Sequence, residues 1–142
     1  MIIATLTLLA ILFMGAADGG WVGYAHKEVS DAVSDSSRAK AAKKILKQMQ
    51  DQIRGHGKQI LGLREELAAV ERNYDSTAED FRKVYRKLDA AWAASEGRLV
   101  SLRTELLQYI SREEWSDLCD RVDADVEKAR AKAEKKARKH SK

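Results

Sequence analysis

Residues 71–80 read ERNYDSTAED, and this short polar stretch separates two long apolar repeats. Ser76 and Glu79 form an S-x-x-E pattern, which is typical of a capping box at the start of a helix. Asn73 or Asp75 can adopt the left-handed conformation that a tight turn needs. The stretch therefore predicts a turn between two helices, with the second helix starting at Ser76.

Apolar residues recur at alternating spacings of three and four on both sides of this turn, as the a and d positions of a coiled coil do. The repeat before the turn comprises Ala39, Ala42, Leu46, Met49, Ile53, His56, Ile60, Leu63, Leu67 and Val70. The repeat after it comprises Phe81, Tyr85, Leu88, Trp92, Ser95, Leu99, Leu102, Leu106 and Tyr109. When the chain is folded about the turn, the two repeats pair layer by layer, with His56 opposite Trp92. This agreement predicts an antiparallel coiled-coil hairpin with arms of about 35 residues, roughly 50 Å long.

Residues 54–57, RGHG, lie inside the first of these helices. A glycine in a helix costs about 1 kcal/mol relative to alanine, so two of them need an explanation. Because His56 falls opposite Trp92, the largest side chain of either repeat, we expect Gly55 and Gly57 to thin the helix where the indole needs space. A bound ligand, a metal or a hinge is the alternative.

No residue pattern indicates catalysis. The sequence has no glycine-rich phosphate loop, no His-x-x-x-His pair and no serine or cysteine with a suitable base. A single cysteine, Cys119, excludes an internal disulfide framework. Besides His56, the histidines are His26 and His140 near the two ends of the chain, so a three-ligand metal site would require oligomerisation. We therefore expect a protein that is not an enzyme and that has no catalytic residue, metal site or cofactor.

The N-terminal residues determine the expected compartment. Residues 2–17, IIATLTLLAILFMGAA, form an uncharged apolar run that would span about 24 Å as a helix, short of the ~30 Å hydrocarbon core of a bilayer. That length is typical of a signal peptide, and small residues precede a plausible cleavage point before Asp18. If the run continues through Ala25, it reaches the length of a membrane anchor, with Trp21 and Tyr24 at the membrane interface.

The orientation at the membrane depends on two opposing features. Basic residues follow the apolar run and none precedes it, which favours an anchor whose tail is cytoplasmic. The shortness of the run favours export. We therefore assign residues 1–25 to a signal peptide or single transmembrane anchor. We place the chain in the cell envelope, on the periplasmic side of the inner membrane, with an anchored cytoplasmic tail as the alternative.

A third helix is predicted after the second repeat. Ser111 and Glu114 form another capping-box pattern, and an apolar face follows. That face comprises Trp115, Leu118, Val122 and Val126. The hairpin carries a secondary apolar stripe that can receive the new helix, which predicts a three-helix bundle. The stripe comprises Val84, Ala91, Val100, Leu107 and Ile110. Alternatively, the face of the third helix stays open and binds a partner helix or a second copy of the chain.

These elements divide the chain into four segments. Residues 1–25 are the signal peptide or anchor, 26–37 a polar linker, 38–127 the hairpin with the third helix, and 128–142 a basic helical tail. The tail has eight lysines and arginines against one glutamate. We expect it to bind anionic lipid or simply to aid solubility, and the absence of aromatic residues disfavours nucleic acid. The anionic-surface candidates are Lys128, Arg130, Lys132, Lys135, Lys136, Arg138 and Lys139.

The composition agrees with an all-α fold. Of the 142 residues, 34% are charged, 6% are aromatic and none is proline, as in long helices. We expect a non-enzymatic structural or interaction protein of the cell envelope that acts by helix–helix docking of its coiled-coil hairpin. The alternatives are an accessory subunit of a membrane complex, anchored by its N-terminal helix, and a periplasmic holdase-like or stress-response binding module.

Overall fold

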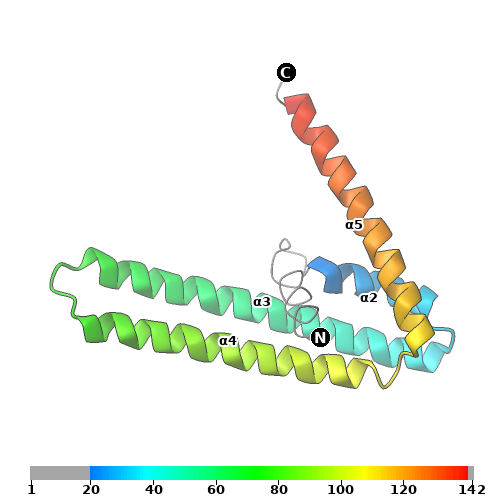
Figure 1. Ribbon diagram of the computed structural model, residues 1–142, viewed down its shortest axis with the longest axis horizontal. Helices are drawn as coiled ribbons and strands as arrows, with labels where there is room; N and C mark the ends of the chain where they lie inside the picture. Colours follow the sequence, from blue (N-terminus) through cyan, green and yellow to red (C-terminus); the bar gives the residue numbers. More distant parts are fainter. Residues whose placement is uncertain (1–19, 141–142) are drawn as a thin grey trace.

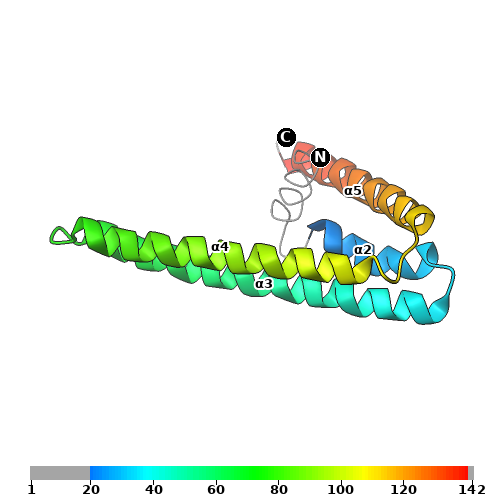
Figure 2. The same ribbon diagram turned by 60° about the horizontal axis from the view of Figure 1, so that its bottom comes forward.

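The computed structural model describes residues 20–140, and within that range it contains four helices and no strand. The helices are α2 (Gly20–Ala32), α3 (Ser36–Arg72), α4 (Ala78–Leu106) and α5 (Arg112–His140). Long helices α3 and α4 lie side by side and run in opposite directions, while α2 and the first part of α5 pack at one end of them (Figures 1 and 2). The prediction of an all-α protein is therefore confirmed.

The turn between α3 and α4 has its cap one residue later than predicted. The Thr77 hydroxyl accepts a hydrogen bond from the backbone N–H of Asp80, and the Asp80 carboxylate accepts one from the backbone N–H of Thr77. Ser76 instead donates its hydroxyl to the Val70 carbonyl, 2.7 Å away, and so closes the end of α3. The capping box is therefore formed by Thr77 and Asp80 and not by Ser76 and Glu79.

The interface between α3 and α4 follows the predicted repeats at one end and departs from them at the other. We call residues 53–95 the arm, and we call α2 together with residues 36–52, 96–106 and 112–126 the base. In the base, the predicted repeat residues are buried. In the arm, Val84 and Ala91 are buried, whereas Tyr85 and Trp92 are 51% and 42% exposed. Val84 and Ala91 are buried in place of Tyr85 and Trp92 because their side chains are smaller. Small side chains let the two helix backbones approach more closely than aromatic rings would.

The predicted polar linker is wrong, because most of it is helical. Helix α2 begins at Gly20, whose φ of 53° suits a glycine, and only residues 33–35 separate it from α3. Val22, Ala25 and Val29 recur at helical spacing and are completely buried. This apolar face outweighs the polar composition of the segment and holds α2 on the hairpin.

The N-terminal anchor was predicted from residues 2–17, which lie outside the described part of the chain. Its possible extension through Ala25 is wrong, because Val22 and Ala25 are buried against protein and are not available to lipid. Within residues 20–140, no helix combines the length and the apolar character needed to cross a membrane.

Helix α5 packs against α2 and does not form the predicted three-helix bundle with the hairpin. Of the stripe expected to receive it, Val84 and Ala91 are buried inside the hairpin, and Val100 and Leu107 remain 53% and 38% exposed. The core lies in the base, where all four helices meet. Its largest completely buried side chains are Leu46, Leu102, Leu106 and Leu118.

One carboxylate joins the segments of the base. Glu114 and Ser111 form the predicted capping box, with hydrogen bonds of 2.9 and 3.2 Å. The Arg38 guanidinium donates to both Glu114 carboxylate oxygens, at 2.7 and 2.9 Å, and to the Tyr109 carbonyl. Ser34 donates to Glu114 through its backbone N–H and its hydroxyl. The Arg38 hydrogen bonds, followed by those from Ser111 and Ser34, hold the pKa of Glu114 well below its usual value.

Candidate functional site

The two aromatic residues expected to anchor the chain in a membrane pack against the protein core. Trp21 and Tyr24 lie on α2 and are partly buried. The Trp21 ring contacts the Trp115 ring, with 5.6 Å between the centroids. Trp21 and Tyr24 therefore belong to the fold of the base, and their assignment as interfacial anchors is corrected.

The face predicted to bind a partner is covered by the chain itself. Leu118 and Val122 are completely buried, and Trp115 and Val126 pack against the same core. Helix α2 is the element that contacts α5. The interpretation of this face as an open docking surface is therefore wrong, because it overlooked α2.

The structure brings His56 and Trp92 together, but the neighbouring glycines have no part in the contact. The two rings meet edge to face, with 4.5 Å between centroids, and burial lowers the pKa of His56. Gly55 and Gly57 are exposed, and a Cβ atom added at either would meet nothing within 4 Å. The expected accommodation of the indole by these glycines is therefore wrong, because Trp92 lies at the edge of the interface with room beside it.

One face of α3 is covered by α2 in the base and continues uncovered into the arm. Helix α2 packs against α3 in the base. Burial lowers the pKa of His26 on α2, and the positive charges of Lys43 and Lys47 on α3 lower it further. Lys43 and Lys47 begin a row of residues that follow one another at spacings of three and four and so share one face of the helix. Leu61 on this row is 59% exposed. The row comprises Lys43, Lys47, Gln50, Arg54, Gly57 and Leu61.

The matching face of α4 is touched by α5 in the base, while α5 packs mainly against α2. The Arg103 guanidinium lies over the Trp115 ring, 5.6 Å from its centroid. The row that starts at Arg103 continues toward the turn through Leu99, Glu96, Trp92, Asp89 and Tyr85. Helices α2 and α5 therefore lie on one side of the hairpin, and no described residue covers the same side along the arm.

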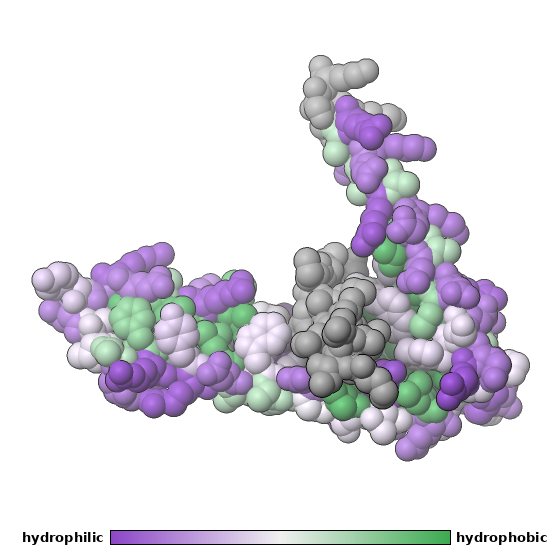
Figure 3. Space-filling model, in the orientation of Figure 1, coloured by the Kyte–Doolittle hydropathy of each residue, from purple (hydrophilic) through white to green (hydrophobic). Residues whose placement is uncertain are grey.

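We call this uncovered surface the arm face and define it by Leu61, Tyr85 and Trp92. Figure 3 shows apolar and aromatic surface running along the arm, with hydrophilic surface on both edges. On the other side of the interface, Lys87 of α4 forms an ion pair with Glu66 of α3. The two sides of the arm thus differ, one being joined by opposite charges and the other presenting large apolar side chains.

Sequence reasoning placed Tyr85 and Trp92 in the hairpin interior and so missed the arm face. Both residues occupy the expected heptad positions, and periodicity alone does not show which neighbours are more buried. A signal was present in Val84 and Ala91, which precede them and share their spacing. Leu61 lies outside the repeat altogether, and an isolated leucine on a helix surface is a common feature.

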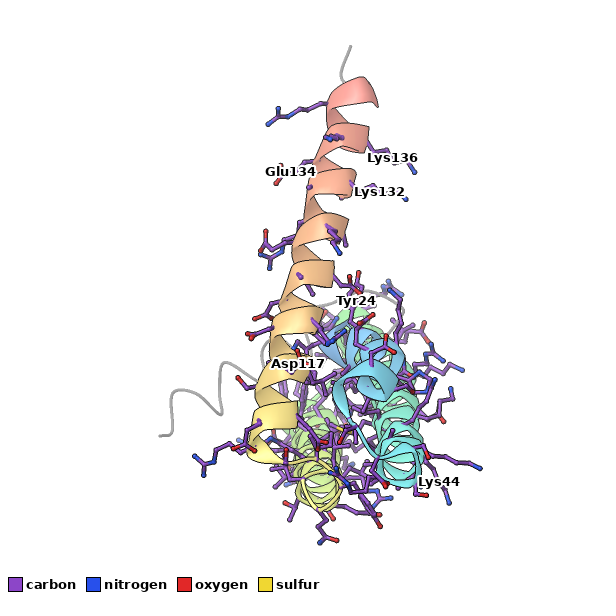
Figure 4. All side chains as sticks on the ribbon, turned by 90° about the vertical axis from the view of Figure 1, so that its right-hand side faces the viewer. Tyr24, Lys44, Asp117, Lys132, Glu134 and Lys136 are labelled. Atoms are coloured by element: carbon purple, nitrogen blue, oxygen red, sulfur yellow. The ribbon has the colours of Figure 1, made fainter. Side chains whose placement is uncertain are left out.

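The basic tail occupies the last part of α5, which projects from the base (Figure 1). Lys132 and Lys136 point to one side of the helix and Glu134 to the other (Figure 4). Lys128 forms an ion pair with Asp125, and Arg130 forms one with Glu127. Lys135 and Arg138 are exposed, and the side chain of Lys139 lies outside the described part of the chain.

The described residues contain no group of histidine, cysteine and acidic side chains that could hold a metal ion. Burial raises the pKa of the Cys119 thiol, which opposes formation of the reactive thiolate. Comparison with known proteins found no matching family model, no matching curated protein and no matching solved structure.

Proposed function

We propose that this chain is a non-enzymatic structural or interaction protein of the cell envelope, and that it acts by docking a helix on the arm face. One observation carries the proposal. The side of the hairpin on which α2 packs in the base, with α5 packed on α2, continues along the arm with Leu61, Tyr85 and Trp92 at 59%, 51% and 42% exposure. A helix laid on this side would extend the packing that the base already has.

Among the described residues, the arm consists of two helices only, α3 and α4. Two helices bury only the side chains between them, so a large side chain at the edge keeps about half of its surface in water. Complete burial of such a side chain is worth about 1.5–3 kcal/mol. Three such residues therefore offer a docking helix a few kcal/mol, against which the cost of association must be set.

The location in the envelope rests on the apolar run of residues 2–17. Two alternatives use the same arm face. An accessory subunit would dock it on a larger membrane complex while anchored through its N-terminal segment. A periplasmic holdase-like protein would present it to unfolded clients, and purified chain would then suppress the aggregation of an unrelated protein.

The basic tail serves in this proposal as an electrostatic auxiliary that meets anionic phospholipid. Each basic residue near an anionic surface contributes about 1 kcal/mol. Binding to vesicles containing phosphatidylglycerol should therefore weaken as salt is raised, and replacement of Lys132, Lys135 and Lys136 by Gln should weaken it by about 3 kcal/mol, roughly a hundredfold. An unchanged affinity in this triple variant would assign the binding to another part of the chain.

Site-specific photocrosslinking in the native host tests the main proposal. A benzophenone side chain replaces Tyr85 on the arm face in one variant and Arg98 in a matched control. Arg98 is exposed and lines a groove with Gln48 and Gln52 on the other side of the hairpin, at the end of the base that adjoins the arm. We expect one discrete protein adduct, identified by mass spectrometry, from position 85 and none from position 98. Equal adducts from both positions, or none from either, would contradict docking at the arm face.

A further inference from the structure

We propose that the arm face is occupied by the chain's own apolar run, residues 2–17, until a membrane takes up the run or cleavage removes it. These residues lie outside the described part of the chain. The inference rests on the proposed function, because it names what regulates access to the same face. A partner helix then docks only on a chain whose run has left the arm.

Helix α2 directs its first residue toward the arm. Only residues 33–35 connect α2 to α3, and the two helices pack against each other, so α2 runs back along α3. Gly20 is about as many residues before this connection as position 48 is after it, which brings it to the end of the base that adjoins the arm. Figure 1 shows this blue end of α2 pointing toward the arm. The chain that precedes Gly20 therefore starts where the arm begins.

The length of the run matches the length of the arm face. Continued along α3 in the same direction as a helix, residues 2–17 would extend from about position 51 to about position 66. Leu61 lies within this interval. The contact between His56 and Trp92 fixes the register of α3 against α4, and about two helical turns farther toward the hairpin turn it places Tyr85 level with position 63. All three residues of the arm face are therefore within reach of the run.

The run also approaches from the side of the hairpin on which the arm face lies. Gln50 and Leu61 belong to one row of α3, and Gln50, at the level where α2 begins, is buried at 8% exposure. Leu61, about three helical turns farther along, is 59% exposed, so the cover of this row ends with α2. Gly20 has a left-handed φ of 53°, which a glycine adopts readily. This conformation lets the preceding chain leave the axis of α2 and lie between α3 and α4.

The run and the arm face have the same chemistry. Residues 2–17 carry no charge, and the arm face is apolar and aromatic between hydrophilic edges (Figure 3). Docking removes apolar surface of both from water. Because the run is joined to α2 by a short connection, its effective concentration at the arm face is about millimolar. The run therefore avoids most of the association cost that a separate helix incurs.

The arm face can cover only one side of the run. A helix that is apolar on all sides is fully buried only inside a protein core or a bilayer. A bilayer therefore competes for the run and takes it from the arm face, and cleavage before Asp18 removes it altogether. Docking on one side is also weaker than the packing of the base, so the run leaves the arm before the base unfolds.

Photocrosslinking of the full chain, synthesised in a membrane-free extract, tests the inference. The benzophenone side chain again replaces Tyr85, or Arg98 in the matched control, and both positions are exposed, so the fold should persist, as circular dichroism would show. We expect a link within one chain from position 85 to the peptide that contains residues 2–17, and none from position 98. Absence of this link, or equal links from both positions, would overturn the inference.

Two variants and a membrane test the contact itself. Leu61→Glu should weaken docking about tenfold, because a charge replaces a leucine in the contact, and so lower the yield of the link from position 85. Gln59→Glu adds the same charge on the other side of the arm, where Gln59 lines a groove with Lys87, and should leave the yield unchanged. Vesicles of phosphatidylethanolamine and phosphatidylglycerol, present during synthesis, should remove the link. A link that persists with vesicles would overturn the release of the run by a bilayer.

The outcomes separate this inference from the function on which it rests. A chain without the internal link that still gives a discrete adduct to another protein from position 85 in the native host keeps the docking function and rejects the run as occupant. An internal link without any adduct to another protein in the host keeps the run as occupant and rejects docking of a partner. An internal link in the absence of membranes, together with a protein adduct in the host, supports both. Neither product rejects both.

Discussion

The base and the arm of this molecule are built from the same two helices but have different interiors. In the base, α2 and α5 complete a core in which Leu46, Leu102, Leu106 and Leu118 are completely buried. In the arm, the interface has no further helix among the described residues and includes the polar side chains of His56 and Ser95. The comparison shows that the number of helices, and not the heptad pattern, determines how much of each side chain is buried.

The arm also contains residues that weaken a helix. Gly55, Gly57 and Gly62 are exposed, and a Cβ at any of them would have open space around it. Exposed glycines lower helix stability without a packing benefit. The base therefore carries the stability of the fold, and the arm presents a surface.

The largest expected effect is a cavity in the base. Leu118→Ala should lower the free energy of unfolding by about 2–5 kcal/mol, because the removed methyl groups leave a void at a completely buried position. Leu61→Ala, at an exposed position of the arm, should change it by about 0.5 kcal/mol or less. Urea unfolding of monomeric protein measures both. Similar losses in the two variants would remove the distinction between base and arm.

A smaller effect is expected from the carboxylate that joins the segments of the base. Glu114→Gln should lower the melting temperature at neutral pH, because Arg38 and Ser34 then lose an ionised acceptor. The pKa of Glu114 is lowered from 4.5 in the folded chain. Its contribution to the free energy of unfolding is therefore complete above pH 4.5 and declines as the pH falls below that value. The melting curves of the two proteins should therefore converge toward acid pH. A constant difference between pH 7 and pH 3 would contradict this assignment.

The next prediction reverses the sequence-based interpretation of RGHG. Gly55→Ala should stabilise the chain by about 0.5–1 kcal/mol, because alanine favours the helix and its methyl group meets nothing within 4 Å. Gly62→Ala, also at an open position of the arm, should act in the same direction. Urea unfolding measures the gain. Destabilisation by either substitution would show that another group covers this side of the arm.

The sequence predicted what depends on local chemistry. The all-α class, the hairpin turn and the Ser111–Glu114 capping box follow from periodicity and from short motifs, and the structure contains them. It failed where the outcome depends on packing among distant segments. The short apolar face of α2 was hidden in a polar stretch, and the choice between Val84 and Tyr85 depends on the volumes that face them. Neither periodicity nor short motifs predicted the arm face. It can be recognised only when the positions of α2 and α5 on the hairpin are known.

The smallest expected effect compares two histidines, His26 in the base and His56 in the arm. Burial lowers the pKa of both, and only for His26 do Lys43 and Lys47 lower it further. Raising the salt concentration from about 0.05 to 1 M shortens the screening length to about 3 Å, so the pKa of His26 should rise while that of His56 stays the same. Two-dimensional NMR titration of the imidazole protons measures both values.

The same titration reports on the closure of the arm. A lowered pKa means that unfolded chain binds protons more readily than folded chain below the usual value of 6.5, so stability should fall as the pH drops through this range. In the His56→Leu variant, the loss of stability at low pH should be smaller. The loss that remains should be the part due to His26. If His56 instead titrates at 6.5 at both salt concentrations, water reaches the arm interior. The arm would then open locally while the base stays folded, so that the two regions would differ in local stability as well as in packing.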